Sequence, residues 1–68
     1  MSASPKVVEA VRVTLKERPE LVAKLRAGKT GIGYLIGQAM MNGPEGSIDV
    51  VEYRDEVRRQ LKELGVET

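Results

Sequence analysis

The amino-acid sequence predicts a small all-α domain, an orthogonal bundle of about four short helices. Apolar residues recur with a helical period in four segments, and capping and turn-forming residues separate these segments. No segment shows the alternation of apolar and polar residues that is typical of a strand. The predicted helices cover residues 5–17, 19–27, 31–42 and 50–64 of one domain, residues 1–68, whose ends at 1–4 and 66–68 are expected to fray.

The first two predicted helices are separated by a proline. Ser4 followed by Pro5 is a typical helix start, with a capping residue and a proline in the first turn. Pro19 either ends the first helix or bends it, because the residue before a proline is biased away from helical geometry. Gly28 marks the end of the second helix. In the first helix, Val8, Val11 and Leu15 recur at helical spacing, with Val7 beside them. In the second helix, the inward positions are Leu21, Val22 and Leu25.

The third predicted helix is apolar along most of its length and contains two glycines. Thr30 is the expected N-cap, and Gly43 before Pro44 ends the helix. An interior glycine costs a helix about 1 kcal/mol relative to alanine. Gly33 and Gly37 therefore need a structural or functional reason.

The fourth predicted helix follows a loop rich in turn formers, residues 42–47. Asp49 and Glu52 have the spacing of a capping box, and Ile48 and Tyr53 that of a hydrophobic staple. The apolar stripe of this helix consists of Val50, Tyr53, Val57, Leu61 and Leu64.

The composition argues against catalysis and against metal or cofactor binding. The chain has no cysteine and no histidine, so disulfides, ordinary zinc sites and the usual nucleophile–base pairs have no side chains to form them. We interpret Glu52, Asp55 and Glu56 as surface carboxylates, with Arg59 paired to Asp55 and to Glu63 at i,i+4 spacing. We therefore expect no catalytic residue, no cofactor and no small-molecule substrate.

The sequence shows neither a secretory signal peptide nor an apolar segment long enough to span a membrane. The first residues, MSASPK, lack the basic and apolar regions of a secretory signal peptide. The apolar third helix is too short to span a bilayer and is interrupted by Gln38. We expect a cytoplasmic protein with no membrane partner.

A cluster of basic residues is the candidate RNA-binding site. The net charge is +1, but residues 1–30 contain seven basic and three acidic residues, whereas residues 31–68 contain four and seven. Lys24, Arg26 and Lys29 lie around the junction of the second and third helices, close in sequence to Tyr34. Such a cluster, with one ring for stacking, is typical of a phosphate-binding edge. Gln38 is either a nucleotide contact or a structural group that caps a neighbouring backbone.

The two glycines of the third helix suggest a second kind of contact. Gly33 and Gly37 leave two bare patches one turn apart on one helix face, and Met41 is next along that face. Small residues at this spacing allow another backbone to approach closely. That backbone belongs either to another helix of this chain or to a partner, which is a second protein or a second copy.

Two segments together resemble a known family. Residues 17–29 read ERPELVAKLRAGK and residues 33–41 read GYLIGQAMM. With the turn-rich loop and the aspartate-capped last helix, they resemble the C-terminal helical tail of the B subunit of the glutamyl-tRNA(Gln)/aspartyl-tRNA(Asn) amidotransferase, the GatB/YqeY-type tail. The resemblance covers roughly residues 7–64. Its most specific part is residues 33–40, with Pro19 and the Ala27–Lys29 segment in agreement.

The resemblance implies a non-catalytic helical appendage that contacts tRNA in support of tRNA-dependent amidation, while the chemistry takes place in other domains and subunits. It also implies either an excised domain or a free-standing relative of the tail. This chain departs from the family's pattern in two places. Residues 42–48 lack the family's lysines, and the connection from Lys29 to Gly33 is about one residue shorter, without a second lysine. Both departures remove candidate phosphate contacts.

Overall fold

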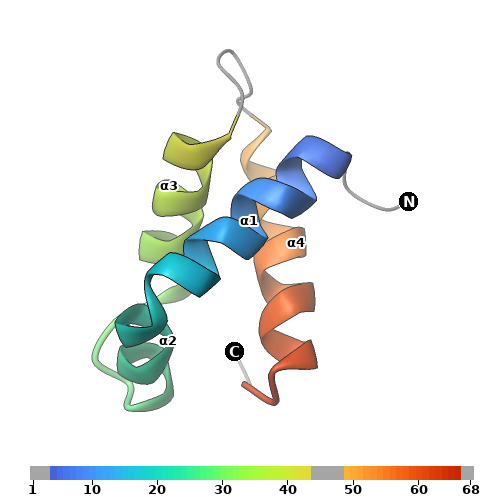
Figure 1. Ribbon diagram of the computed structural model, residues 1–68. Coiled ribbons are helices and arrows are strands. Elements are labelled where there is room, and N and C mark those ends of the chain that lie inside the picture. The colour runs from blue at the N-terminus through green and yellow to red at the C-terminus, as the bar shows by residue number, and fades with distance from the viewer. Residues whose placement is uncertain (1–3, 44–48, 67–68) are drawn as a thin grey trace.

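The computed structural model describes residues 4–43 and 49–66, and these residues form four helices around one core (Figure 1). The helices are α1 (Pro5–Glu17), α2 (Pro19–Arg26), α3 (Ile32–Asn42) and α4 (Val50–Glu63). α1 lies diagonally across α3 and α4 and packs against both, while α3 and α4 pack against each other. α2 packs mainly against α1. The predicted all-α bundle is confirmed.

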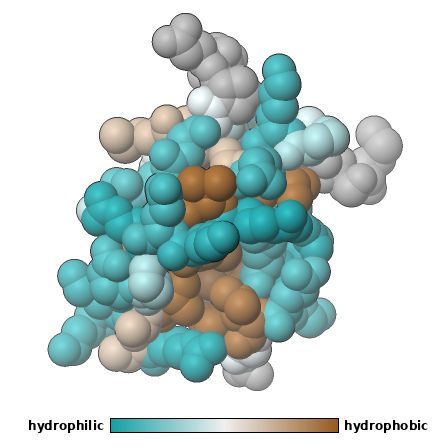
Figure 2. Space-filling model, viewed as in Figure 1, coloured by the Kyte–Doolittle hydropathy of each residue, from teal (hydrophilic) through white to brown (hydrophobic). Residues whose placement is uncertain are grey.

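The core lies where α1, α3 and α4 meet. α2 contributes one buried residue, Leu21, so it lies at the edge of the core rather than within it. On the face shown in Figure 2, hydrophilic side chains dominate, and apolar ones are visible in the gaps between them. The buried apolar residues are Val7, Ala10, Val11, Leu15, Leu21, Leu35, Ile36, Ala39, Tyr53, Val57, Leu61 and Val66.

Three of the four helix starts were assigned correctly from the sequence. The Asp49 carboxylate accepts a hydrogen bond from the Glu52 N–H at 3.1 Å, as the capping box predicts. Pro5 begins α1, although the Ser4 side chain makes no capping hydrogen bond with the described residues. The N-cap of α3 is Gly31, so the assignment of Thr30 was wrong by one position. The expected staple includes Ile48, which lies outside the described residues.

Glycines in the left-handed conformation end α2 and α4. Gly28 has φ +74° and Gly65 has φ +79°, a region that other residues rarely adopt. After Gly28, the Lys29 N–H donates to the Lys24 carbonyl at 2.8 Å. This bond is the 6→1 hydrogen bond of a Schellman motif. After Gly65, the same motif turns Val66 into the core, where it is 5% exposed, so the fraying expected for residues 66–68 does not include Val66.

The buried side of α4 differs from the predicted apolar stripe. Tyr53, Val57 and Leu61 are buried as expected, but Val50 and Leu64 are 51% and 52% exposed. Glu56 and Gln60 are buried instead, because α1 crosses α4 beside them and the Gln60 amide donates to the Val8 carbonyl at 3.0 Å. Burial of these polar groups is tolerated because each is hydrogen-bonded.

The end of α3 packs closely against a tyrosine of α4. Tyr53 is fully buried, and its hydroxyl has no hydrogen-bond partner among the described residues. A Cβ atom placed on Gly43 would overlap this hydroxyl and would lie 2.9 Å from Tyr53 Cζ. Gly43 is therefore required by the packing of the fold.

Candidate functional site

The structure brings three of the five predicted RNA-binding residues together. Lys24, Lys29 and Tyr34 line one surface hollow of about 250 Å³, between α2 and the start of α3. We call it the basic hollow. Its other lining residues are Arg18, Glu20, Leu21 and Thr30.

Local backbone structure explains why the two lysines are neighbours. Lys24 is in the last turns of α2, and the Schellman motif at Gly28 folds the chain back so that Lys29 bonds to the Lys24 carbonyl. Tyr34 is in the first turn of α3, where its N–H donates to the Gly31 carbonyl at 3.2 Å. The backbone of the two lysines is thus joined by a turn, and Tyr34 stands in the first turn of α3.

The basic hollow carries a net positive charge. Three cations and one carboxylate line it, which gives a formal charge of +2. Arg18 is partly neutralised by Glu20, at 3.4 Å, whereas Lys24 and Lys29 are exposed and form no ion pair with the described residues. The first turn of α3 contains no acidic residue, and no side chain caps it. Its N–H groups add a partial positive charge at the rim, which favours an anion there.

Arg26 and Gln38 are not part of the basic hollow. The Arg26 guanidinium donates to the Leu64 carbonyl at 3.0 Å, so it links α2 to the end of α4. Gln38 is half-buried on α3, one turn after Tyr34, and its side chain makes no hydrogen bond with the described residues. Its proposed backbone-capping role is therefore absent from the described part of the chain.

Sequence reasoning missed Arg18, which lines the basic hollow together with the predicted residues. Arg18 stands between α1 and α2, where φ −125° and ψ 60° break the helical periodicity. Helical spacing therefore does not predict that Arg18 and Lys24 lie on the same side of the molecule. The only available signal was the charge of Arg18 next to the proline break.

The glycine face of α3 is not a helix crossing within this chain. Gly33 and Gly37 are exposed, and a Cβ atom on either would meet no described atom within 4 Å apart from its chain neighbours and the backbone of its own helix. Met41, on the same face, is 78% exposed. α1 and α4 instead pack against the opposite side of α3, which carries Leu35, Ile36 and Ala39. The intramolecular explanation for the glycines is wrong, and the explanation through a partner stays a prediction.

The carboxylates of α4 have a structural role. Glu56 is 3% exposed and accepts hydrogen bonds from Arg59 Nε at 2.9 Å and from Gln60 Nε2 at 2.6 Å. The Arg59 hydrogen bond, helped by Gln60, lowers the pKa of Glu56 although burial opposes it. Arg59 also binds Glu63, as predicted, but its predicted partner Asp55 contacts Arg54 instead. Among the described residues, no group of three or more acidic, histidine or cysteine side chains is arranged to hold a metal ion.

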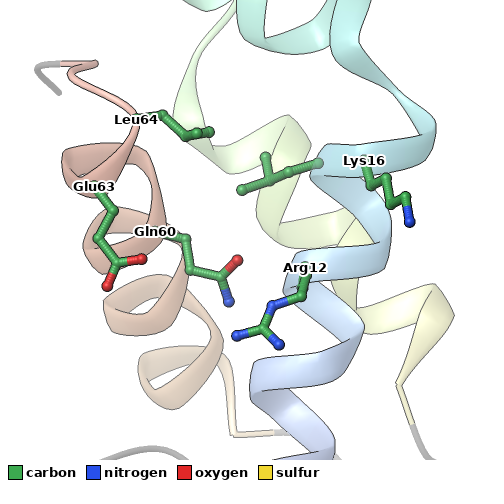
Figure 3. Close-up of a pocket in the computed structure, with 6 residues that line it drawn as sticks. Arg12, Lys16, Gln60, Glu63 and Leu64 are labelled. Atoms are coloured by element: carbon green, nitrogen blue, oxygen red, sulfur yellow. The ribbon is translucent and has the colours of Figure 1, made fainter.

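A second hollow, of about 300 Å³, lies between α1 and α4 (Figure 3). Figure 3 shows Gln60 and Leu64 pointing from α4 toward α1, with Arg12 reaching back from α1. No aromatic side chain lines this hollow, and its charges are mixed. It is therefore a poorer nucleotide site than the basic hollow. The lining residues are Arg12, Leu15, Lys16, Gln60, Glu63 and Leu64.

Comparison with known proteins adds no family to these observations. No family model matches the chain, and no curated protein or solved structure is detectably similar to it. Of the helices in residues 4–43 and 49–66, none has the length and apolar character needed to cross a membrane. The features of the described residues that bear on function are therefore the basic hollow and the exposed face of α3.

Proposed function

We propose that this chain is a non-catalytic helical module that binds RNA through the basic hollow, with tRNA as the first candidate. The observation that carries the proposal is the convergence of Lys24, Lys29 and Tyr34 on one hollow. A contact with tRNA agrees with the resemblance to the amidotransferase tail. The module then acts in the cytoplasm, in support of tRNA-dependent amidation.

The charges of the basic hollow set the expected strength of binding. Phosphate contacts release counterions, so the affinity falls with salt in proportion to the number of phosphates neutralised. Arg18, Lys24 and Lys29 provide three cations, of which Arg18 is already paired with Glu20. We expect weak binding with a slope of log K against log salt of about −2.

The test is a titration of labelled bulk tRNA with the protein at two salt concentrations. Binding should weaken as salt rises, and the double variant Lys24→Gln/Lys29→Gln should bind about 10-fold more weakly and with a shallower salt slope. The matched control is Lys16→Gln/Lys62→Gln, which removes the same charge from exposed positions outside the basic hollow. Equal loss in both double variants, or binding insensitive to salt, would reject the proposal.

A second candidate function is supported by the open glycine face of α3. This face is uncharged, since α3 has no charged residue, and Tyr34 and Met41 are 51% and 78% exposed on it. Such a face fits a protein partner or a second copy of the chain. Sedimentation of the wild type and Gly37→Leu tests self-association. Since Gly37 faces open space, the variant should stay folded and lose any association; a wild type that is monomeric at all concentrations rejects self-association.

A further inference from the structure

The chain has one aromatic ring that an RNA base can reach. Its aromatic residues are two tyrosines, and Tyr53 is fully buried whereas Tyr34 is 51% exposed. Tyr34 lines the basic hollow, beside the two lysines. A base bound there therefore has one stacking surface and a nearby positive charge.

Glycines leave the surroundings of this ring open. On a helix surface, the neighbours of a residue are those three and four positions away. For Tyr34, the positions three before and three after are Gly31 and Gly37, which are exposed, and the positions four away are Thr30 and Gln38, which are partly buried. A Cβ atom on either glycine would meet no described atom within 4 Å apart from its chain neighbours and adjacent backbone. Gly33, directly before Tyr34, is open as well. On its glycine side, the ring is thus flanked by backbone without side chains, which allows a flat ligand to approach from that side.

The positive groups of the basic hollow come from α2, from the residue before it and from the turn that follows it. The turn at Gly28 joins the backbone of Lys24 to that of Lys29, and the N-terminal turn of α3 carries no acidic residue. The hollow has a volume of about 250 Å³ and can hold one small group. Its lining includes both lysines and Tyr34.

We infer that the basic hollow binds an unpaired nucleotide, with its phosphate against Lys24 and Lys29 and its base stacked on Tyr34. This inference rests on the RNA binding proposed above and names the class of RNA, a single-stranded segment or an open loop. A paired base is stacked within its helix and offers no free face to the ring. The glycines around Tyr34 then serve access to the ring, rather than packing of the fold.

The test compares three ligands of the same length by fluorescence anisotropy: an unstructured RNA oligonucleotide, its abasic analogue and its duplex. The abasic analogue keeps the phosphates and removes the bases. The wild-type protein should bind the unstructured oligonucleotide about 10-fold more tightly than the abasic analogue, since stacking on an aromatic ring contributes on that scale. Equal binding of the two, or tighter binding of the duplex, would overturn the inference.

Two variants separate stacking from charge. Tyr34→Ala should abolish the preference for the base-containing oligonucleotide, and Tyr34→Phe should keep it, because phenylalanine retains the ring. Lys24→Gln/Lys29→Gln should weaken the oligonucleotide and its abasic analogue by the same factor, because both carry the phosphates. Preference retained in Tyr34→Ala would also overturn the inference.

Tyrosine fluorescence gives an independent signal, because the chain has no tryptophan. Stacking should quench Tyr34 in the wild type, and the quenching should be absent in Tyr34→Phe, in which buried Tyr53 is the remaining fluorophore. Failure of the proposed function is distinguishable from failure of this inference. If neither tRNA nor any oligonucleotide binds, the RNA function fails; if the abasic analogue binds as well as the RNA, only the stacking inference fails.

Discussion

The two tyrosines of this chain each lie beside glycine in or at the end of α3, yet their environments are opposite. Tyr53 is fully buried, and its hydroxyl fills the space that a side chain at Gly43 would need. Tyr34 is half-exposed, and the space around Gly33 and Gly37 is open. Glycine makes room for the core in the first case and leaves a surface bare in the second. The residue types alone do not distinguish these two uses.

The largest expected difference between the two regions is in stability. Tyr53→Ala should lower the free energy of unfolding by about 3–5 kcal/mol, because it removes a fully buried ring and leaves a cavity. A loss of this size is comparable to the whole stability of a small domain, so the variant should be largely unfolded by circular dichroism. Tyr34→Ala should change stability by less than about 0.5 kcal/mol. Similar losses for both variants would contradict the comparison.

The next effect concerns Gly43. Gly43→Ala should destabilise the protein by about 2 kcal/mol in urea unfolding, since the new methyl group overlaps the Tyr53 hydroxyl. Combining it with Tyr53→Phe should recover part of this loss, because the hydroxyl is removed while Cζ still lies 2.9 Å from the new Cβ position. A double-mutant cycle measures the coupling, and strictly additive effects would show that the two residues do not touch.

The buried side of α4 carries a charge, whereas α3 carries none, so only the former should make stability depend on pH. The pKa of Glu56 is lowered from its ordinary value of 4.5, mainly by the Arg59 hydrogen bond. The ionised Glu56 carboxylate therefore stabilises the folded state above pH 4.5, and this stabilisation is lost as the pH falls through the lowered pKa. Glu56→Gln should cost about 1.5 kcal/mol at neutral pH and flatten the acid limb of the stability curve. An unchanged acid limb would show that other carboxylates control it.

The smallest expected effect is a gain. Gly37→Ala should stabilise the protein by about 0.5–1 kcal/mol, because alanine favours the helix and its methyl group meets open space. The melting temperature should rise by a few degrees in a thermal scan. Gly43→Ala is the matched control, with the opposite sign. A clear destabilisation by Gly37→Ala would mean that this face is packed after all.

The sequence was sufficient where a local rule determines the structure. Asp49 caps α4 because its carboxylate reaches the Glu52 N–H, and Gly28 ends α2 because it adopts a positive φ. The all-α class and the bounds of α1 follow from similar short-range signals, and the structure confirms them. These features depend on neighbours within one turn of helix.

The orientation of α3 could not be predicted, for a physical reason. Apolar residues lie on all sides of this helix, so its periodicity does not indicate which side faces the core. From the sequence, Gly33 and Gly37 could face either another helix of the chain or a partner, and the structure shows that Leu35 and Ala39 face the core instead. The candidate site was predicted only in part, for a different reason. Lys24 and Lys29 are joined by a local turn, but Arg26 bonds to the Leu64 carbonyl, which is distant in sequence.

The position of α2 at the edge of the core has a consequence for the kinetics of exchange with solvent. α2 is the shortest helix and buries only Leu21, whereas the other helices each bury at least three residues. Its amide hydrogens should therefore exchange through local opening, well before those of α1 and α4. Lys24 is part of this helix, so an anion bound in the basic hollow should restrain α2. Binding of a phosphate should therefore slow hydrogen exchange along the whole of that helix.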